Sequence, residues 1–156
     1  MSGSAGTAVK AASAGTLSRA MAIAAEVCGA QVAHAKLGSQ SLEFKPGPIK
    51  SGDYKFDIGT AGSSTLVLQT LIPALLYGDG PSTVTVTGGT HNPMAPPVQF
   101  LKRAYCRVLT QMGAHADIHL RRFGFYPAGG GEVFAEIAPC PQLHKIEIMT
   151  RGPLRE

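Results

Sequence analysis

Residues 59–64, GTAGSS, form a turn of small residues that could bind a negatively charged group. Backbone N–H groups at a helix N-terminus, together with the positive end of the helix dipole, attract anions such as phosphate. Gly62 would let a ligand approach the backbone, and the hydroxyls of Ser63 and Ser64 would offer further hydrogen bonds. The same residue types also make an ordinary helix cap, and local features alone favour the cap.

Residues 88–97, GGTHNPMAPP, place Thr90, His91 and Asn92 in a loop framed by glycine and proline. Polar groups on a loop that a rigid scaffold positions often bind ligands. His91 could contact a phosphate, because an imidazole can gain a positive charge near neutral pH. A single loop histidine is more often merely solvated, so both interpretations stay open.

Gln69 stands among apolar residues of an expected helix, where a buried amide would need hydrogen-bond partners. It is either a buried structural hydrogen bond or a group reserved for a ligand. Arg121 and Arg122 precede residues 124–131, GFYPAGGG, whose three consecutive glycines suit a hairpin connection or a close approach to a ligand. The two arginines could contact phosphate, although exposed charge at a strand end is the simpler interpretation.

Hydrophobic periodicity predicts the elements that must position these residues. Helical spacing predicts helices over residues 17–28 and 65–77, and a third from Pro96-Pro97 to Gly113 with an apolar stripe that includes Val108. Strands are expected at residues 32–35, 41–44, 54–58, 83–87, 116–120, 133–137 and 143–149.

This order of elements predicts an α+β fold of tandem βαβαββ repeats, with one complete repeat preceded by half of another. Residues 51–140 would be the complete repeat, and residues 17–50 the second half of the preceding one. Residues 1–16 would be a flexible lead-in, and residues 141–156 the start of a following segment. The sequence is thus expected to be cut at both ends, and such incomplete repeats would leave exposed faces that favour self-association.

Composition places the 156 residues among globular chains of about one domain. No apolar run reaches the roughly 20 residues that a membrane span needs, so no membrane association is expected. Three widely separated cysteines argue against a disulfide framework or a closed zinc site, and we expect no metal site from these residues. Residues 97–156 hold eight basic and five acidic residues, against six and five before them, which is compatible with a polyanionic partner.

Three long motifs together resemble one known family. GTAGSSTLVLQTLIPALL, DGPSTVTVTGGTHNPMAPP and GFYPAGGGEV, in this order and spacing, are similar to the RNA 3'-terminal phosphate cyclases. The resemblance runs from about residue 17 to residue 156 and is strongest between residues 52 and 137. It implies a cytoplasmic enzyme (nuclear in a eukaryote) that uses ATP and a divalent metal, Mg or Mn, to convert an RNA 3'-phosphate into a 2',3'-cyclic phosphate through a histidine–AMP intermediate.

The resemblance also implies roles for two residues and leaves part of the reaction unassigned. Gln69 falls on the nucleotide-contacting glutamine of the family, and Pro97 falls where a proline packs against adenine. The nucleotidylated histidine would lie C-terminal to this chain, and Phe123 stands where the family commonly has a basic residue. We therefore expect a fragment that cannot complete the reaction alone.

Two other functions stay open at this point. The first is a non-catalytic relative that acts in RNA or ribosome assembly. The second is an enolpyruvyl-type transferase, which would need several basic residues around phosphate and carboxylate groups, whereas residues 52–100 offer only Lys55.

Overall fold

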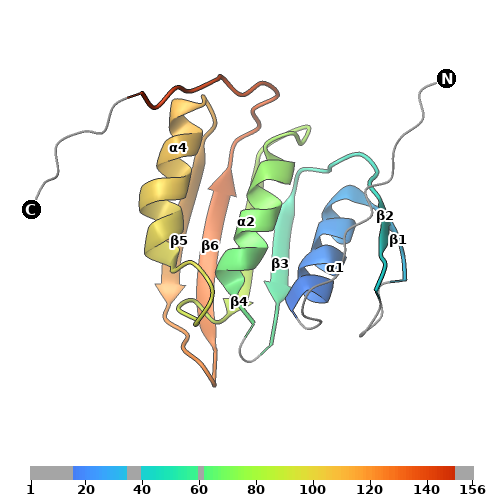
Figure 1. Cartoon of the computed structure of the whole chain (residues 1–156), viewed down its shortest axis with the longest axis vertical. Coiled ribbons are helices and arrows are strands. Elements are labelled where there is room, and N and C mark those ends of the chain that lie inside the picture. Colours follow the sequence, from blue (N-terminus) through green and yellow to red (C-terminus); the bar gives the residue numbers. More distant parts are fainter. Residues whose placement is uncertain (1–15, 35–39, 60–61, 150–156) are drawn as a thin grey trace, which may run out of the picture.

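A four-stranded mixed β-sheet forms the centre of the computed structural model, which describes residues 16–34, 40–59 and 62–149 (Figure 1). Its strands are β3 (Asp53–Asp57), β4 (Ser82–Gly88), β5 (Ala116–Arg122) and β6 (Gly131–Ile137), in the order β3-β4-β6-β5. β3 runs parallel to β4, whereas β6 is antiparallel to both β4 and β5. The strands expected from alternation at these places are confirmed.

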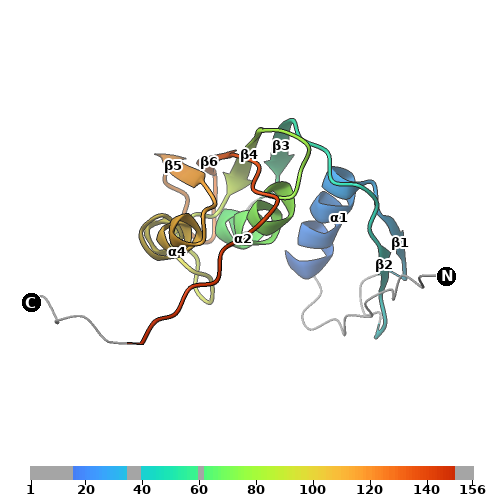
Figure 2. The same ribbon diagram turned by 90° about the horizontal axis from the view of Figure 1, so that it is seen from above.

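The alternating residues explain which face of the sheet is covered. Val84 and Val86 on β4, and Val133 and Ala135 on β6, are fully buried, and the residues between them are partly exposed. Side chains of successive strand residues point to opposite faces, so the apolar set faces the helices. Figure 2 shows the helices on one side of the sheet and the other side uncovered.

Two helical segments cover the apolar face of the sheet. α2 (Ser64–Leu75) follows β3, and the Ser63 hydroxyl caps its N-terminus by accepting a hydrogen bond from the Leu66 backbone N–H at 3.3 Å. The second segment is continuous and comprises α3 (Val98–Phe100), η1 (Leu101–Tyr105) and α4 (Cys106–Gln111), with Pro97 as its N-cap residue. Both helices therefore begin at the end of the sheet where β3 and β4 finish.

A π-helical turn at η1 changes which residues of the second helix face the core. A π turn adds a residue to the helical turn, so the apolar stripe shifts by one position after it. Leu101, Cys106 and Leu109 are buried, whereas Val108 is 39% exposed. Leu101 and Leu109 of the expected stripe are buried as predicted, whereas the expected burial of Val108 is wrong, because it assumed a regular period of 3.6 residues.

A smaller unit precedes the sheet along the chain. It contains α1 (Thr16–Cys28) and a separate antiparallel pair, β1 (Gln31–Ala33) and β2 (Glu43–Lys45). Gly29 ends α1 with a φ of +56°, the left-handed conformation expected there. α1 lies beside α2 and carries the β1–β2 pair on its far side (Figures 1 and 2). Of the expected lead-in, residues 1–15 lie outside the described residues, and Thr16 is already in α1.

The mixed α+β class is confirmed, and residues 51–140 show the expected order β, α, β, α, β, β. Tandem repetition of that unit stays a prediction. The strand expected at residues 143–149 is wrong, because none of these residues joins a strand ladder. Their segment bonds to helix ends instead: the Cys140 N–H donates to the Leu76 carbonyl at 2.6 Å, and the His144 N–H to the Met112 carbonyl at 2.8 Å.

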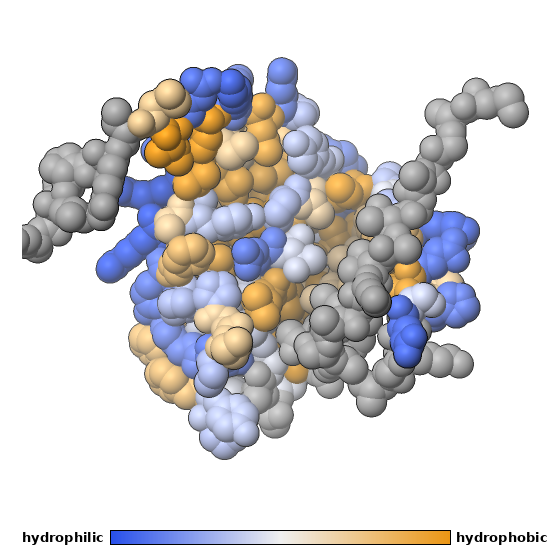
Figure 3. Space-filling view, viewed as in Figure 1, coloured by the Kyte–Doolittle hydropathy of each residue, from blue (hydrophilic) through white to orange (hydrophobic). Residues whose placement is uncertain are grey.

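The helix-covered face is partly apolar at its surface. Figure 3 shows apolar side chains gathered over the upper ends of α2 and α4, where the segment after β6 crosses them. Leu143 of that segment packs against the core. Among the described residues, none of the helices is both long enough and apolar enough to span a membrane.

Candidate functional site

The turn at residues 59–64 and the loop at residues 88–97 meet at one end of the sheet. Because β3 and β4 are parallel, the segments that follow them leave from the same edge. The Gly89 N–H donates to the Gly62 carbonyl at 2.7 Å, and the Ser64 N–H donates back to the Gly89 carbonyl at 2.9 Å. Two motifs separated by about 25 residues in the sequence therefore form one rigid junction.

The β5–β6 connection joins the same end of the sheet through Thr90. The Thr90 N–H donates to the Gly124 carbonyl at 2.8 Å, and the Gly124 N–H donates to Thr90 Oγ1 at 3.0 Å. A Cβ on Gly131 would stand 2.6 Å from the Gly124 nitrogen and 2.6 Å from the Thr90 methyl group. These backbones approach closely only because both positions are glycine.

His91 has a contact at each ring nitrogen and against its ring face at this junction. Its Nδ1 lies 2.8 Å from Thr90 Oγ1, and its Nε2 lies 2.7 Å from Gln99 Oε1. The Thr90 hydroxyl also donates to the Gly124 carbonyl at 3.2 Å, so it joins His91 to the β5–β6 connection. The ring also contacts Phe123 and Phe125, with centroids 5.3 and 5.6 Å away. The interpretation that His91 is merely solvated is therefore wrong.

The hydroxyls of the first turn are turned inward. Ser63 is 5% exposed and Ser64 fully buried, and the Ser64 hydroxyl donates to the Gly89 carbonyl at 2.8 Å. The Ser63 hydroxyl caps α2 and lies 2.7 Å from Thr65 Oγ1. The helix-cap interpretation is confirmed for Ser63. Phosphate contact by Gly62, Ser63 or Ser64 stays a prediction, and the hydroxyls would have to exchange their present partners to make it.

Gln69 and Pro97 are both exposed. The alternative that Gln69 makes a buried structural hydrogen bond is therefore wrong. Gln69 is five residues beyond Ser64, which places it about 8 Å along α2 from the helix start. Pro97 begins the neighbouring helix at the same end of the sheet. A single surface that contains both residues, and their nucleotide roles, stay predictions.

Asn92 lies over the junction, and the predicted arginines lie at its border. A Cβ on Gly89 would overlap the Asn92 side-chain amide, so this loop is closely packed. Arg121 faces the open side of the sheet, where it pairs with Glu132 at 3.2 Å and covers the Phe134 ring at 4.1 Å. Arg122 is exposed and donates from Nε to the Gly130 carbonyl at 2.6 Å. Of the two, Arg122 is bonded to the loop and Arg121 to the sheet.

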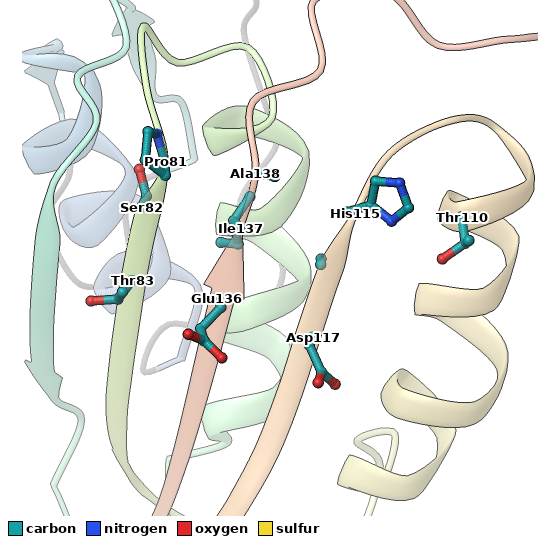
Figure 4. A pocket seen from close by; sticks show the side chains of 10 residues that line it. Pro81, Ser82, Thr83, Thr110, His115, Asp117, Glu136, Ile137 and Ala138 are labelled. Carbon is teal, nitrogen blue, oxygen red and sulfur yellow. The ribbon is translucent and has the colours of Figure 1, made fainter.

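Two cavities border the sheet and do not include the junction. One, of about 360 Å³, lies at the opposite end, where Ser82, His115, Asp117 and Glu136 line it (Figure 4). The other, of about 400 Å³, is lined by residues of all four strands, including Lys55, Thr85 and Arg121. Neither contains Gln69 or Pro97.

Nucleophiles and metal ligands are scarce in the part of the chain that the structure describes. There, no group of His, Cys, Asp or Glu side chains has an arrangement that could hold a metal ion, although His119 lies close to Asp117 and Glu136. Cys28, Cys106 and Cys140 are free and buried. Burial, with a smaller effect of the Asp117 carboxylate, raises the pKa of Cys106 to about 11, so this side chain stays a protonated thiol near neutral pH.

Sequence reasoning missed three residues of this site, namely Gln99, Phe123 and Phe125. The two phenylalanines are two residues apart, and this spacing in an extended segment places them on one side. That signal was available from the sequence. Gln99 has no such signal, because its contact with His91 depends on how the loop turns into the helix.

Comparison with known proteins identifies close relatives. Residues 18–151 match the model of the family described as "RNA 3'-terminal phosphate cyclase". A protein of that name from Ralstonia nicotianae is 58% identical over 138 residues, which are 88% of this chain and 40% of that protein. Another of that name, from Pseudomonas fluorescens, is 56% identical over 135 residues, 86% of this chain and 39% of its own length. The chain thus spans about two fifths of the length of the curated relatives it matches.

Proposed function

The chain belongs to the RNA 3'-terminal phosphate cyclase family, and on this premise we propose that its loop junction is one wall of a site where ATP meets the 3'-phosphate of RNA. The observation that carries the proposal is the direct contact between the three motifs. Gly62 bonds to Gly89 and Thr90 bonds to Gly124, so three distant segments are fixed against one another. A surface assembled in this way is preorganised, which is what binding of a flexible phosphate chain requires.

The proposed reaction of the whole enzyme has three displacements at phosphorus. A histidine nitrogen attacks the α-phosphorus of ATP, and pyrophosphate leaves. An oxygen of the RNA 3'-phosphate then attacks the phosphorus of the histidine-bound AMP, and the histidine leaves. Finally the neighbouring 2'-hydroxyl oxygen attacks the 3'-phosphorus, loses its proton and displaces AMP, which leaves a 2',3'-cyclic phosphate. Formation of the covalent intermediate divides one difficult step into easier ones.

Within this reaction, the described residues would bind and orient rather than react. The Gln69 amide, exposed on α2, offers both a donor and an acceptor to an adenine edge. Pro97 would present its ring beside that base, and Arg122 would attract phosphate. The divalent metal that the resemblance implies is assigned no ligand among the described residues.

The attacking histidine is proposed to lie outside the described residues. His91 is an unsuitable nucleophile because both ring nitrogens are engaged within the chain. His119 lies between two carboxylates on the uncovered side of the sheet, 3.1 Å from Asp117 and 3.5 Å from Glu136, away from the loop junction. The chain alone is accordingly expected to bind ATP without becoming adenylylated.

Calorimetric titration with ATP tests the binding role of Gln69. Replacing one hydrogen-bonding amide, Gln69→Ala, is expected to weaken ATP binding about 3- to 10-fold. Thr70→Ala is the matched control, since Thr70 is the next exposed residue of α2 and its hydroxyl bonds to the Leu66 carbonyl. An equal effect of both variants, or no ATP binding by the unmodified chain, would contradict the proposed surface.

Incubation with ATP labelled at the α-phosphate tests the missing nucleophile. The expected result is no label on the denatured protein and no cyclisation of RNA that ends in a 3'-phosphate. A labelled histidine would refute the assignment. A chain that binds RNA with no preference for ATP or a 3'-phosphate would instead favour the non-catalytic role in RNA assembly.

A further inference from the structure

Three aromatic side chains of the β5–β6 connection are exposed to an extent that packing within the described chain does not explain. Phe123 is 57% exposed, Phe125 56% and Tyr126 69%. Burial of an aromatic ring is strongly favourable, so a cluster that stays exposed marks a surface with another use. Phe123 and Phe125 lie on the same side of the segment, with parallel rings whose centroids are 5.9 Å apart.

The cluster is held rigidly. His91 packs against both phenylalanine rings and is itself bonded through both ring nitrogens, to Thr90 and Gln99. The backbone is fixed on both sides: the Gly124 carbonyl accepts from the N–H of Thr90, and the Phe125 carbonyl accepts from the N–H of Gly129 at 2.7 Å. Little conformational entropy is therefore lost when a ligand covers these rings.

The charge of the arginine side chains beside the cluster indicates which chemical class of ligand it could bind. Arg121 and Arg122 precede the cluster; Arg121 is paired with Glu132 at 3.2 Å, whereas no ion pair of Arg122 is found among the described residues. Arg122 is exposed, and its one described contact is with the Gly130 carbonyl through Nε, so the rest of its guanidinium faces outward from that contact. Exposed aromatic rings beside unpaired positive charge are the features with which proteins bind single-stranded nucleic acid, through base stacking and phosphate contacts.

We propose that Phe123 and Phe125, braced by His91, form an aromatic platform on which an unpaired base near the 3' end of the RNA stacks. This proposal rests on the proposed function, which it deepens by naming how the RNA is held. Phe123 and Phe125 flank Gly124, which bonds to Thr90. They lie at the end of the sheet where α2 begins after its cap, Ser63. A base stacked there would bring its neighbouring phosphate toward the loop junction.

Fluorescence of a short RNA tests stacking directly. The probe is a single-stranded oligoribonucleotide that ends in a 3'-phosphate and carries 2-aminopurine as its last base, whose emission is quenched on stacking. The 156-residue chain is expected to quench it. Phe125→Ala and Phe123→Ala should weaken binding about 5- to 150-fold and abolish the quenching. Tyr77→Ala is the control, because Tyr77 is similarly exposed, at 53%, but follows the far end of α2.

Two further variants separate stacking from simple apolar contact. Phe125→Tyr retains an aromatic face and should bind as the unmodified chain does, whereas Phe125→Leu should lose binding as Phe125→Ala does. If Phe125→Leu binds normally, the platform is overturned. If the alanine variants leave RNA binding unchanged but alter the elution volume in size-exclusion chromatography, the patch is a protein contact and the platform is likewise overturned.

An abasic RNA gives a test that needs no protein variant. Removing the terminal bases while keeping the 3'-phosphate should weaken binding to the unmodified chain as much as Phe125→Ala weakens binding to intact RNA. Equal affinity for abasic and intact RNA would overturn the platform. ATP titration distinguishes failure of the platform from failure of the proposed function. ATP binding without RNA binding overturns only the platform, whereas binding of neither ligand overturns the proposed function as well.

Discussion

Thr90 and Gly124 are joined by three hydrogen bonds across the end of the sheet, one of them from the Thr90 hydroxyl to the Gly124 carbonyl at 3.2 Å. The Thr90 N–H donates to the Gly124 carbonyl at 2.8 Å, and Thr90 Oγ1 accepts from the Gly124 N–H at 3.0 Å. The pair ties the loop after β4 to the connection between β5 and β6. Because both residues are buried, breaking either backbone N–H hydrogen bond leaves a buried polar group that no water molecule can reach as a replacement partner.

Thr90→Val should therefore destabilise the fold although it preserves the shape of the side chain. The variant leaves the Gly124 N–H buried without an acceptor, and the expected loss is about 1–3 kcal/mol in the free energy of unfolding. Urea denaturation followed by circular dichroism measures it. Thr90→Ser keeps the hydroxyl and should lose less, and a Thr90→Val chain as stable as the original would contradict the role of these bonds.

Gly131→Ala and Gly130→Asn should differ sharply although the two glycines are adjacent. A Cβ on Gly131 meets the Gly124 nitrogen at 2.6 Å, so overpacking should cost about 1–3 kcal/mol or more. Gly130 has open space around it and a φ of +69°, which asparagine adopts more readily than other residues. Its replacement should cost about 1 kcal/mol or less. Thermal unfolding of both variants measures the two losses of stability. If Gly131→Ala costs no more than Gly130→Asn, the close approach of Gly131 to Gly124 is contradicted.

Lysine substitutions at positions 106 and 108 test the π turn. Val108 is 39% exposed, so Val108→Lys should change stability by less than about 0.5 kcal/mol. Cys106 is 6% exposed, and Cys106→Lys would bury an unpaired charge and should unfold much of the population. A regular helix would instead face Val108 toward the core, and comparable losses at both positions would show that the turn is absent.

The buried Cys106 thiol should make stability depend on pH in the alkaline range. Burial raises its pKa from 9.0 to about 11 in the folded chain, so folding favours the protonated thiol. Its contribution is complete below about pH 9, the pKa of the unfolded chain, and is lost as the pH rises through 11. Cys106→Ala removes this contribution. The difference in unfolding free energy between the original chain and the variant should thus be constant from pH 7 to 8.5 and fall toward pH 11.

Much of the fold follows from local sequence patterns. The alternation around Phe56, the valines of β4 and the glycine after α1 each specify an element by the residues within it. Gln69 shows how a local sequence pattern can mislead when only the neighbouring residues are considered. Its apolar neighbours suggested burial, but the buried residues of α2 recur with a helical period that leaves position 69 on the exposed side.

The remaining differences depend on contacts between distant segments. His91 is fixed by Phe123 and Phe125, more than 30 residues away, and no local pattern encodes that contact. The alternation at residues 143–149 is typical of a strand, but an extended segment without a strand beside it forms no ladder. The π turn at Leu101–Tyr105 likewise has residues that are unremarkable for a helix.

The position of β6 between β4 and β5 has a consequence during synthesis on the ribosome. β6 is the last strand of the sheet to be made, yet it supplies the partner for both of its neighbours. A nascent chain that ends before Gly131 holds β5 without any partner and β4 with one open side. The order of translation therefore delays closure of the sheet until residue 137 has left the exit tunnel, and until then the sides of β4 and β5 that pair with β6 stay open.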